Sequence, residues 1–177
     1  MSFSGAAVRQ FCDWADSLGV TYWVDGGWGV DALLGEQTRE HDDLDLALDE
    51  EAAAVLVPAL RERGFVEVAL DRPGRSDWNF VLADVHHHQL DLHIVRWDEE
   101  GRGVLGPAEA GSFYPPGSLT GTGTIAGRAV RCVEPVAMVA FHTGYAVDED
   151  DWADVSRLCD RFGIPVPDDY AEFVSRG

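Results

Sequence analysis

The chain has 177 residues, which suits one compact domain with a substantial core, or a catalytic core with a small helical appendage. Its formal net charge of -19 argues against a nucleic-acid partner, because nucleic-acid binding depends on Lys and Arg side chains that neutralise phosphates. The same charge would attract a polycationic small molecule, although an acidic surface can also serve solubility alone. No stretch is long and apolar enough to cross a membrane, and the first residues lack the apolar core of a signal peptide. We therefore expect a cytoplasmic protein without a membrane partner.

The first elements predicted along the chain are a helix, a short strand and a second helix. Residues 5–18 have one apolar side at helical spacing, and residues 22–24 are typical of a short buried strand. Gly26 and Gly27 then predict a tight turn, followed by helical spacing over residues 28–34. At the start of such a helix, free N–H groups and the helix dipole favour a bound phosphate. A plain strand-to-helix connection would use the same glycines.

The next strand pattern begins with alternating aspartate and leucine. Residues two apart in a strand share one face, so Asp43 and Asp45 would project together while Leu44 and Leu46 face the other side. Two adjacent carboxylates repel each other unless a cation lies between them, and Mg²⁺ with oxygen ligands is the usual solution. A solvated acidic strand end would give the same short pattern. Together with the glycine turn, the pair predicts a phosphate site beside a metal site.

The rest of the chain predicts further strands and helices around an irregular segment. Strands are expected at residues 65–70, 78–85 and 90–95, a hairpin at 120–133, and helices at 50–63, 134–145 and 151–162. Residues 101–124 are rich in Gly, Pro, Ser and Thr, and we expect them to form a loop that contributes to a binding pocket.

At these motifs the sequence resembles a known enzyme family. The segments VDGGWGVDALLG and TREHDDLDLAL are similar to those of nucleotidyltransferases in the DNA polymerase β superfamily. The resemblance is greatest to the aminoglycoside 2''-nucleotidyltransferases and the lincosamide nucleotidyltransferases. It continues through QLDLHIV and RCVEPVAMVAFHTGY, so it covers most of the chain.

The resemblance implies a fold and a division of the chain. The fold would be the α/β (α+β) nucleotidyltransferase fold of the DNA polymerase β type, in which helices flank a mixed sheet. Residues 1–133 would form the nucleotidyltransferase core. Residues 134–177 would form a C-terminal helical segment that packs on this core as part of one compact unit.

The resemblance also implies a reaction that needs a nucleoside triphosphate and a metal. A nucleoside monophosphate, with AMP from ATP as first choice, would pass to a hydroxyl group of a small molecule. Asp43 and Asp45 would hold two Mg²⁺ ions that bridge the triphosphate and the reacting oxygens. In the family an aspartate on a later strand completes the metal site and, in several members, deprotonates the acceptor hydroxyl. The resemblance implies this catalytic role for Asp91. The alternative for Asp91 is a half-exposed strand carboxylate, and His93 lies beside it on the same face of the predicted strand.

The nucleotide would be bound near the glycine pair. The amides of Gly26, Gly27 and Trp28 would bind the β- and γ-phosphates, and Arg39 would assist unless it is only a surface residue. The chain departs from the family at residues 147–155, where VDEDDWADV has acidic residues at positions that are often cationic in the relatives. If those cationic groups hold phosphates in the relatives, the departure implies an altered nucleotide site here.

The acceptor is the least constrained part of this hypothesis. An aminoglycoside is the first choice, because a cationic acceptor suits the net charge of -19. A lincosamide is the second choice, and another metabolite remains open. A non-catalytic descendant that binds a cationic ligand is the alternative to an enzyme.

Overall fold

The computed structural model describes residues 3–68, 77–107 and 112–176, so the end of the strand expected at 65–70 lies outside the described residues. The strands are β1 (Trp23–Val24), β2 (Asp43–Asp49), β3 (Val66–Glu67), β4 (Asn79–Ala83), β5 (Gln89–Trp97), β6 (Gly103–Leu105), β7 (Phe113–Tyr114), β8 (Gly121–Ile125) and β9 (Arg128–Cys132). The helices are α1 (Gly5–Ser17), α2 (Gly26–Leu34), α3 (Glu50–Glu62), α4 (Pro135–Phe141), α5 (Glu149–Phe162) and α6 (Ala171–Val174), with short 3-10 turns η2 (Ser118–Thr120) and η3 (Asp168–Tyr170).

Among the described residues the strands form one mixed sheet. Seven of them follow the order β3-β4-β5-β2-β1-β9-β8, while β6 pairs with the far end of β5 and β7 pairs with β6. The β2–β5 and β1–β9 pairs are parallel, and the other pairs are antiparallel. The predicted mixed sheet flanked by helices is confirmed.

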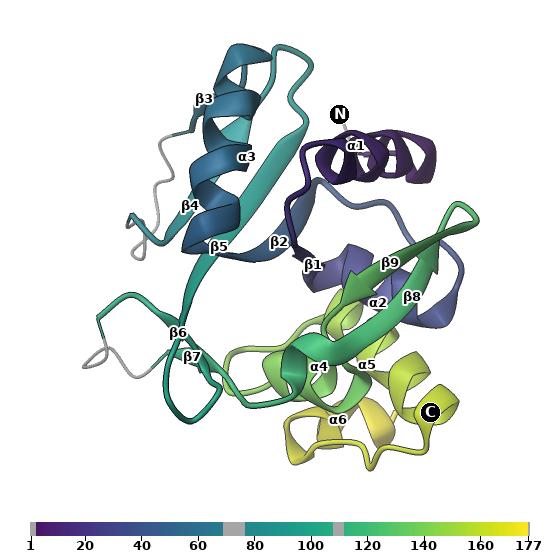
Figure 1. The fold of residues 1–177 in the computed structure, drawn as a ribbon. Helices are drawn as coiled ribbons and strands as arrows, with labels where there is room; N and C mark the ends of the chain where they lie inside the picture. The colour runs from purple at the N-terminus through teal and green to yellow at the C-terminus, as the bar shows by residue number, and fades with distance from the viewer. Residues whose placement is uncertain (1–2, 69–76, 108–111, 177) are drawn as a thin grey trace.

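The helices cover different parts of this sheet. Helix α3 lies along β2 and β5, whereas α2 packs on the β8–β9 hairpin (Figure 1). Helices α4 and α5 pack on α2, so the C-terminal helices gather on the side of the molecule away from α3 (Figure 1). The boundary between core and C-terminal segment at residue 133 stays a prediction.

The alternation of leucine and aspartate fixes how β2 sits in the sheet. Leu44, Leu46 and Leu48 are fully buried, and they lie beside Leu90 and Leu92 of β5, which are equally buried. Burying one such side chain contributes about 1.5–3 kcal/mol. A slip by one residue would turn every leucine to the opposite face, so this burial strongly specifies the register.

Several predicted elements have different boundaries in the structure, and the helix expected at 134–145 already ends at Phe141. The segment expected to be an irregular loop contains the paired strands β6 and β7, which are too short to give a periodic sequence signal. Gly26 and Gly27 do not precede α2 but form its first residues, because Asp25 is the N-cap and the helix begins two residues earlier than expected.

The acidic run at residues 147–155 has a local structural explanation. Asp148 is the N-cap of α5, and its side chain and that of Asp151 form a reciprocal capping box. Glu149 and Asp150 add negative charge to the first turn, where it interacts favourably with the helix dipole. These residues therefore stabilise the start of α5.

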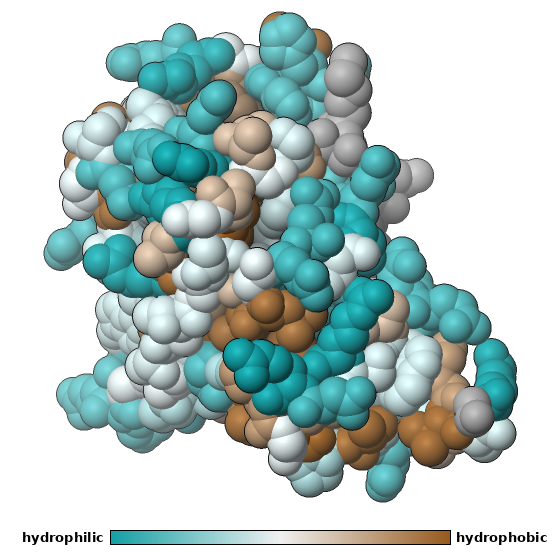
Figure 2. All heavy atoms as spheres, turned by 90° about the vertical axis from the view of Figure 1, so that its right-hand side faces the viewer, coloured by the Kyte–Doolittle hydropathy of each residue, from teal (hydrophilic) through white to brown (hydrophobic). Residues whose placement is uncertain are grey.

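Polar side chains cover much of the surface on the face seen in Figure 2. Figure 2 shows one face on which hydrophilic side chains predominate, with hydrophobic groups in its middle and lower parts. Among the described residues, no helix combines the length and the apolar character that crossing a bilayer requires.

The contact between α2 and β8 gives a test of the packing. A Cβ atom at Gly123 of β8 would overlap with the carbonyl group of Ala32 in α2. Because backbone cannot move aside as a side chain can, we expect Gly123→Ala to lower the free energy of unfolding by about 2 kcal/mol. Urea denaturation measures this value.

Gly5→Ala is the matched control, because the nearest atoms to a Cβ at Gly5 are 3.7 Å away. It should change the free energy of unfolding by no more than about 0.5 kcal/mol. Equal effects of the two substitutions would contradict the close packing of α2 on β8.

Candidate active site

The pairing of β2 with β5 places acidic side chains from two strands next to each other. The strands are parallel, and Asp45 lies opposite Asp91 in their register. One carboxylate oxygen of each aspartate and one ring nitrogen of His93 all lie within 4.8 Å of one another. The Nε2 atom of His93 is 3.6 Å from Oδ1 of Asp91 and 3.9 Å from Oδ1 of Asp45. The structure therefore brings Asp45 and Asp91 together, with His93 beside them.

Asp43 lies on the same strand as Asp45, and its charge acts on that carboxylate. It lies two residues before Asp45 on β2, but it is not one of the three donors within 4.8 Å. Burial raises the pKa of Asp45 to about 8, and the nearby charge of Asp43 adds to this rise. Burial alone would lower the pKa of His93, but the adjacent carboxylate of Asp91 and the charges of Asp25 and Asp45 raise it to about 9. Burial is thus the main cause of the Asp45 shift, whereas the neighbouring aspartates cause the rise for His93.

The donor set suits a divalent cation. Carboxylate oxygens are the ligands that Mg²⁺ prefers, and an imidazole nitrogen is a common additional ligand for divalent transition metals. A cation at this point would also offset the repulsion between the carboxylates. Across residues 3–68, 77–107 and 112–176, the group formed by Asp45, Asp91 and His93 is the one cluster of this kind.

The start of α2 lies against this cluster. The backbone N–H of Asp25 donates to the carbonyl oxygen of Asp45 at 2.9 Å, and Oδ1 of Asp25 accepts from the N–H of Gly26 at 2.8 Å. Gly26 has a φ of 54°, and a Cβ atom there would clash with the Asp45 carboxylate. A Cβ atom at Gly27 would clash with the ring of His41. Close approach of neighbouring side chains therefore requires both glycines.

The loop after α2 is held next to these glycines. Nε2 of His41 lies 2.5 Å from Oδ2 of Asp31, and both side chains are buried. The other oxygen of Asp31 accepts hydrogen bonds from the backbone N–H and the hydroxyl of Thr38, at 2.9 and 2.6 Å. The ring of Trp28 is buried and packs against His41, which supports a structural role for this side chain.

Arg39, the last predicted site residue, has a partner that the sequence did not indicate. Its Nε and NH2 atoms donate to Oδ2 of Asp154 in α5, at 3.1 and 2.9 Å. The position of a Cβ atom on Gly27 would be 2.9 Å from NH2 of Arg39. Arg39 is therefore adjacent to the glycine pair, as expected, and is anchored there by the C-terminal segment.

Asp25 and Tyr114 are two functional candidates that the sequence reasoning missed. The hydroxyl of Tyr114 donates to Oδ2 of Asp25 at 2.6 Å and lies 3.0 Å from Nδ1 of His93. Burial and the charge of Asp25 raise the pKa of Tyr114 well above its usual value, so the hydroxyl keeps its proton. Because that proton goes to Asp25, Nδ1 of His93 must donate to the phenol oxygen. Nε2 of His93 then faces Asp45 and Asp91.

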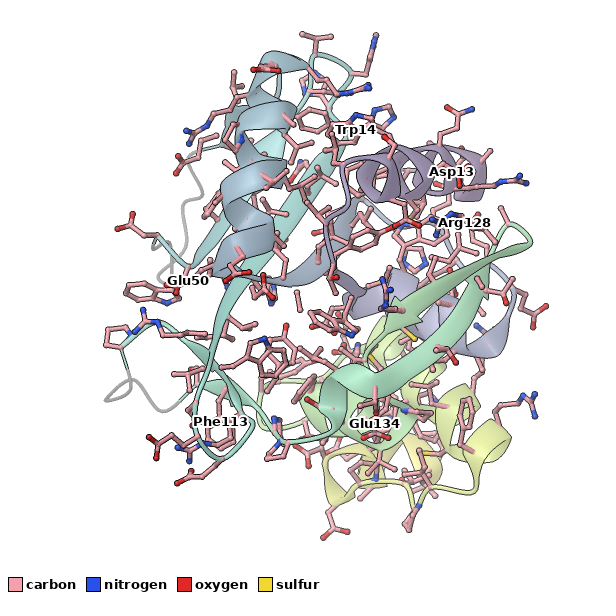
Figure 3. The ribbon with its side chains drawn as sticks, viewed as in Figure 1. Asp13, Trp14, Glu50, Phe113, Arg128 and Glu134 are labelled. Carbon is pink, nitrogen blue, oxygen red and sulfur yellow. The ribbon has the colours of Figure 1, made fainter. Side chains whose placement is uncertain are left out.

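A cavity of about 480 Å³ opens beside this hydrogen-bonded chain. Its walls are largely apolar, with Leu105, Phe113, Pro115 and Phe141 among the lining residues, while Asp25, His93 and Tyr114 supply polar groups. Figure 3 shows Phe113, which belongs to β7, on the side of the molecule away from the tip of the β8–β9 hairpin. The segment between β5 and β8 thus contributes pocket walls, as the sequence predicted. The cavity can hold a small molecule next to the carboxylates.

Comparison with known proteins places this site in a family. The sequence profile of the family described as aminoglycoside-2''-adenylyltransferase matches residues 7–158. A lincosamide resistance protein of Staphylococcus haemolyticus is 30% identical over 146 residues, covering 82% of this chain and 88% of the relative. A 2''-aminoglycoside nucleotidyltransferase of Klebsiella pneumoniae is 33% identical over 154 residues, covering 82% of this chain and 77% of the relative.

A solved structure supports the same family assignment. The lincomycin-bound lincosamide antibiotic adenylyltransferase LnuA matches with a TM-score of 0.74 and 27% identity, over 89% of this chain and 98% of LnuA. The resemblance inferred from the two glycine and aspartate motifs is confirmed. The chain belongs to the aminoglycoside-2''-adenylyltransferase family and is a nucleotidyltransferase.

Proposed function

We propose that this protein transfers AMP from ATP, with Mg²⁺ as the metal, to a hydroxyl group of an antibiotic. The observation that carries the proposal is the opposition of Asp45 and Asp91 in adjacent parallel strands, beside the first turn of α2. Membership of a nucleotidyltransferase family supports the reaction type. The choice of ATP and of Mg²⁺ rests on the resemblance and on the oxygen-rich donor set.

Asp45, Asp91 and His93 would hold one divalent cation, and Asp43 would complete the site for a second ion beside Asp45. Bound Mg²⁺ would neutralise charge on the triphosphate and on the pyrophosphate that leaves. The protein itself prepares this site by fixing both strands in register through their buried leucines, so the carboxylates need no rearrangement.

The first turn of α2 would bind the phosphates. The first N–H groups of a helix have no acceptor within the helix, so the amides of Gly27 and Trp28 can donate to phosphate oxygens. Gly26 lets this turn approach Asp45, which places the phosphates near the carboxylates. Arg39 would add a positive charge from the loop above Gly27.

Asp91 would accept the proton of the acceptor hydroxyl. The hydroxyl oxygen then forms a bond to the α-phosphorus of ATP, and the bond from that phosphorus to the bridging oxygen of pyrophosphate breaks. His93 lines the cavity and faces Asp91, so it would contact the acceptor near the reacting hydroxyl. Tyr114 and Asp25 would keep the ring of His93 in this orientation.

The cavity walls bear on the choice of acceptor. The apolar lining favours a lincosamide, which has one basic amine and a largely apolar ring, over a polycationic aminoglycoside. The net charge of -19 and the 2''-aminoglycoside relatives favour an aminoglycoside. Because contacts at the cavity act on the bound acceptor and net charge acts mainly on encounter, we give the lining more weight.

Loss of a metal carboxylate gives the first test. We expect Asp45→Asn to lower turnover by about a thousandfold at saturating substrates, because the cation and the transition-state charge lose a ligand. Release of pyrophosphate in the presence of ATP, Mg²⁺ and acceptor measures the rate.

Asp42→Asn is the matched control, since Asp42 is exposed and lies one residue before β2. It removes the same charge without touching the cluster, so its turnover should stay within a factor of about two. An Asp45→Asn protein that is folded and fully active would refute the assignment.

The acceptor class is tested by the same assay with a panel of antibiotics. We expect ATP-dependent pyrophosphate release with lincomycin and a lower kcat/KM with aminoglycosides, because the cavity offers few anionic groups to several ammonium groups. The mass of the product should increase by one AMP. The reverse order of kcat/KM would show that net charge, and not the apolar lining, selects the acceptor.

A further inference from the structure

Asp154 lies at an unusual place for a carboxylate. It belongs to α5, in the C-terminal segment, and it is fully buried. Its Oδ2 atom accepts two hydrogen bonds from Arg39, while its Oδ1 atom is buried and has no hydrogen-bond partner among the described residues. A buried charge that is only half satisfied is costly, and such ion pairs often add no net stability. Stability alone therefore does not account for this pair.

The pair does fix the position of Arg39. Three N–H groups of its guanidinium are engaged, two with Asp154 and one with the carbonyl oxygen of Glu40 at 3.3 Å. A guanidinium has five N–H groups, which leaves two for a ligand. The backbone of Arg39 is held as well, because its carbonyl oxygen accepts from Nε2 of Gln37 at 2.9 Å. The result is an arginine with little freedom, whose NH2 atom lies beside Gly27.

We propose that Asp154 is a positioning residue, which holds the guanidinium of Arg39 over the first turn of α2 so that it meets a nucleotide phosphate. This inference rests on the proposed function, since it requires Arg39 to bind the nucleotide. It gives the acidic segment at 147–155 a role in nucleotide binding, through an arginine supplied by a distant loop. Helix α5 carries Asp154 and packs on α2, whose first residues are the glycine pair. This packing keeps Asp154 close to the glycine pair.

The sign of the effect distinguishes positioning from simple electrostatics. A nucleoside triphosphate is strongly anionic, so removing a negative charge near its site should tighten binding if charge alone acts. If Asp154 acts by holding Arg39, the same removal should weaken binding, because an unrestrained arginine loses side-chain entropy when it binds. The two explanations therefore predict opposite changes in affinity.

A double-mutant cycle on nucleotide binding tests the proposal. The dissociation constant for α,β-methylene-ATP with Mg²⁺ is measured by calorimetry for the wild type, Asp154→Ala, Arg39→Ala and the double variant. We expect each single variant to bind about tenfold more weakly, the scale of one lost charge-assisted hydrogen bond. The double variant should bind no more weakly than Arg39→Ala, because Asp154 then has nothing to position.

Two further variants serve as a charge control and as a conservative substitution. Asp160 is exposed on the same helix, so Asp160→Asn removes one charge away from Arg39 and should leave the affinity unchanged or slightly tighter. Asp154→Asn keeps the size of the side chain and one neutral acceptor. Its nucleotide affinity should therefore lie between that of the wild type and that of Asp154→Ala. It also replaces Asp154→Ala in the cycle if the alanine variant does not fold.

Three results would overturn the proposal. Unchanged or tighter binding by folded Asp154 variants would show that Asp154 is a bystander or competes with phosphate. Equal weakening with and without Arg39 would show that Asp154 acts through another group. No effect of Arg39→Ala would remove the role of Arg39 and this inference with it. Failure of the wild type to bind the nucleotide would instead refute the proposed function.

Discussion

The parallel pairing of β2 with β5 is the interaction on which the rest of the structure depends. Buried leucines on both strands specify its register, and that register sets Asp45 opposite Asp91. The hydrophobic effect on one face of the sheet thus forces together two carboxylates that would repel each other on the opposite face. Burial of Asp45 raises its pKa, and the charges of Asp43, Asp25 and Asp91 add to this rise. A bound cation would relieve the repulsion.

The other parts of the site approach this pair from separate segments of the chain. Helix α2 reaches Asp45 because Gly26 has no side chain to prevent it. Strand β7 contributes Tyr114, which joins the cap of α2 to His93 through two hydrogen bonds. Helix α5 contributes Asp154, which secures Arg39. The site is therefore a product of tertiary packing, although its acidic centre belongs to adjacent strands.

The sequence predicted the parts of the site that follow from local periodicity. The period of two in a strand was enough to place Asp43 and Asp45 on one face, and the resemblance supplied Asp91 as their companion. The glycine pair was predicted to form a tight turn at a phosphate site, but its packing against the side chains of Asp45 and His41 was not predicted. Asp25 could also have been found, because an aspartate just before a predicted helix is a common N-cap.

The contacts between distant segments could not be predicted in this way. Tyr114 lies in a strand of two residues, and nothing in its local sequence indicates a hydrogen bond to a residue 89 positions earlier. The acidic run at the start of α5 was interpreted as a departure at the nucleotide site. In the structure most of that run caps a helix, and Asp154 alone turns inward to Arg39, 115 positions away. Such pairings depend on the packed fold.

The most direct test of this account is calorimetric titration of an ATP analogue with and without Mg²⁺, comparing the wild type with Asp91→Asn. The account predicts that Mg²⁺ lowers the dissociation constant of the nucleotide for the wild type. In the folded variant this effect of Mg²⁺ should be at least about tenfold smaller, because a metal ligand is missing. Equal Mg²⁺-dependent affinities in the two proteins would contradict the claim that Asp45 and Asp91 act as one cation site.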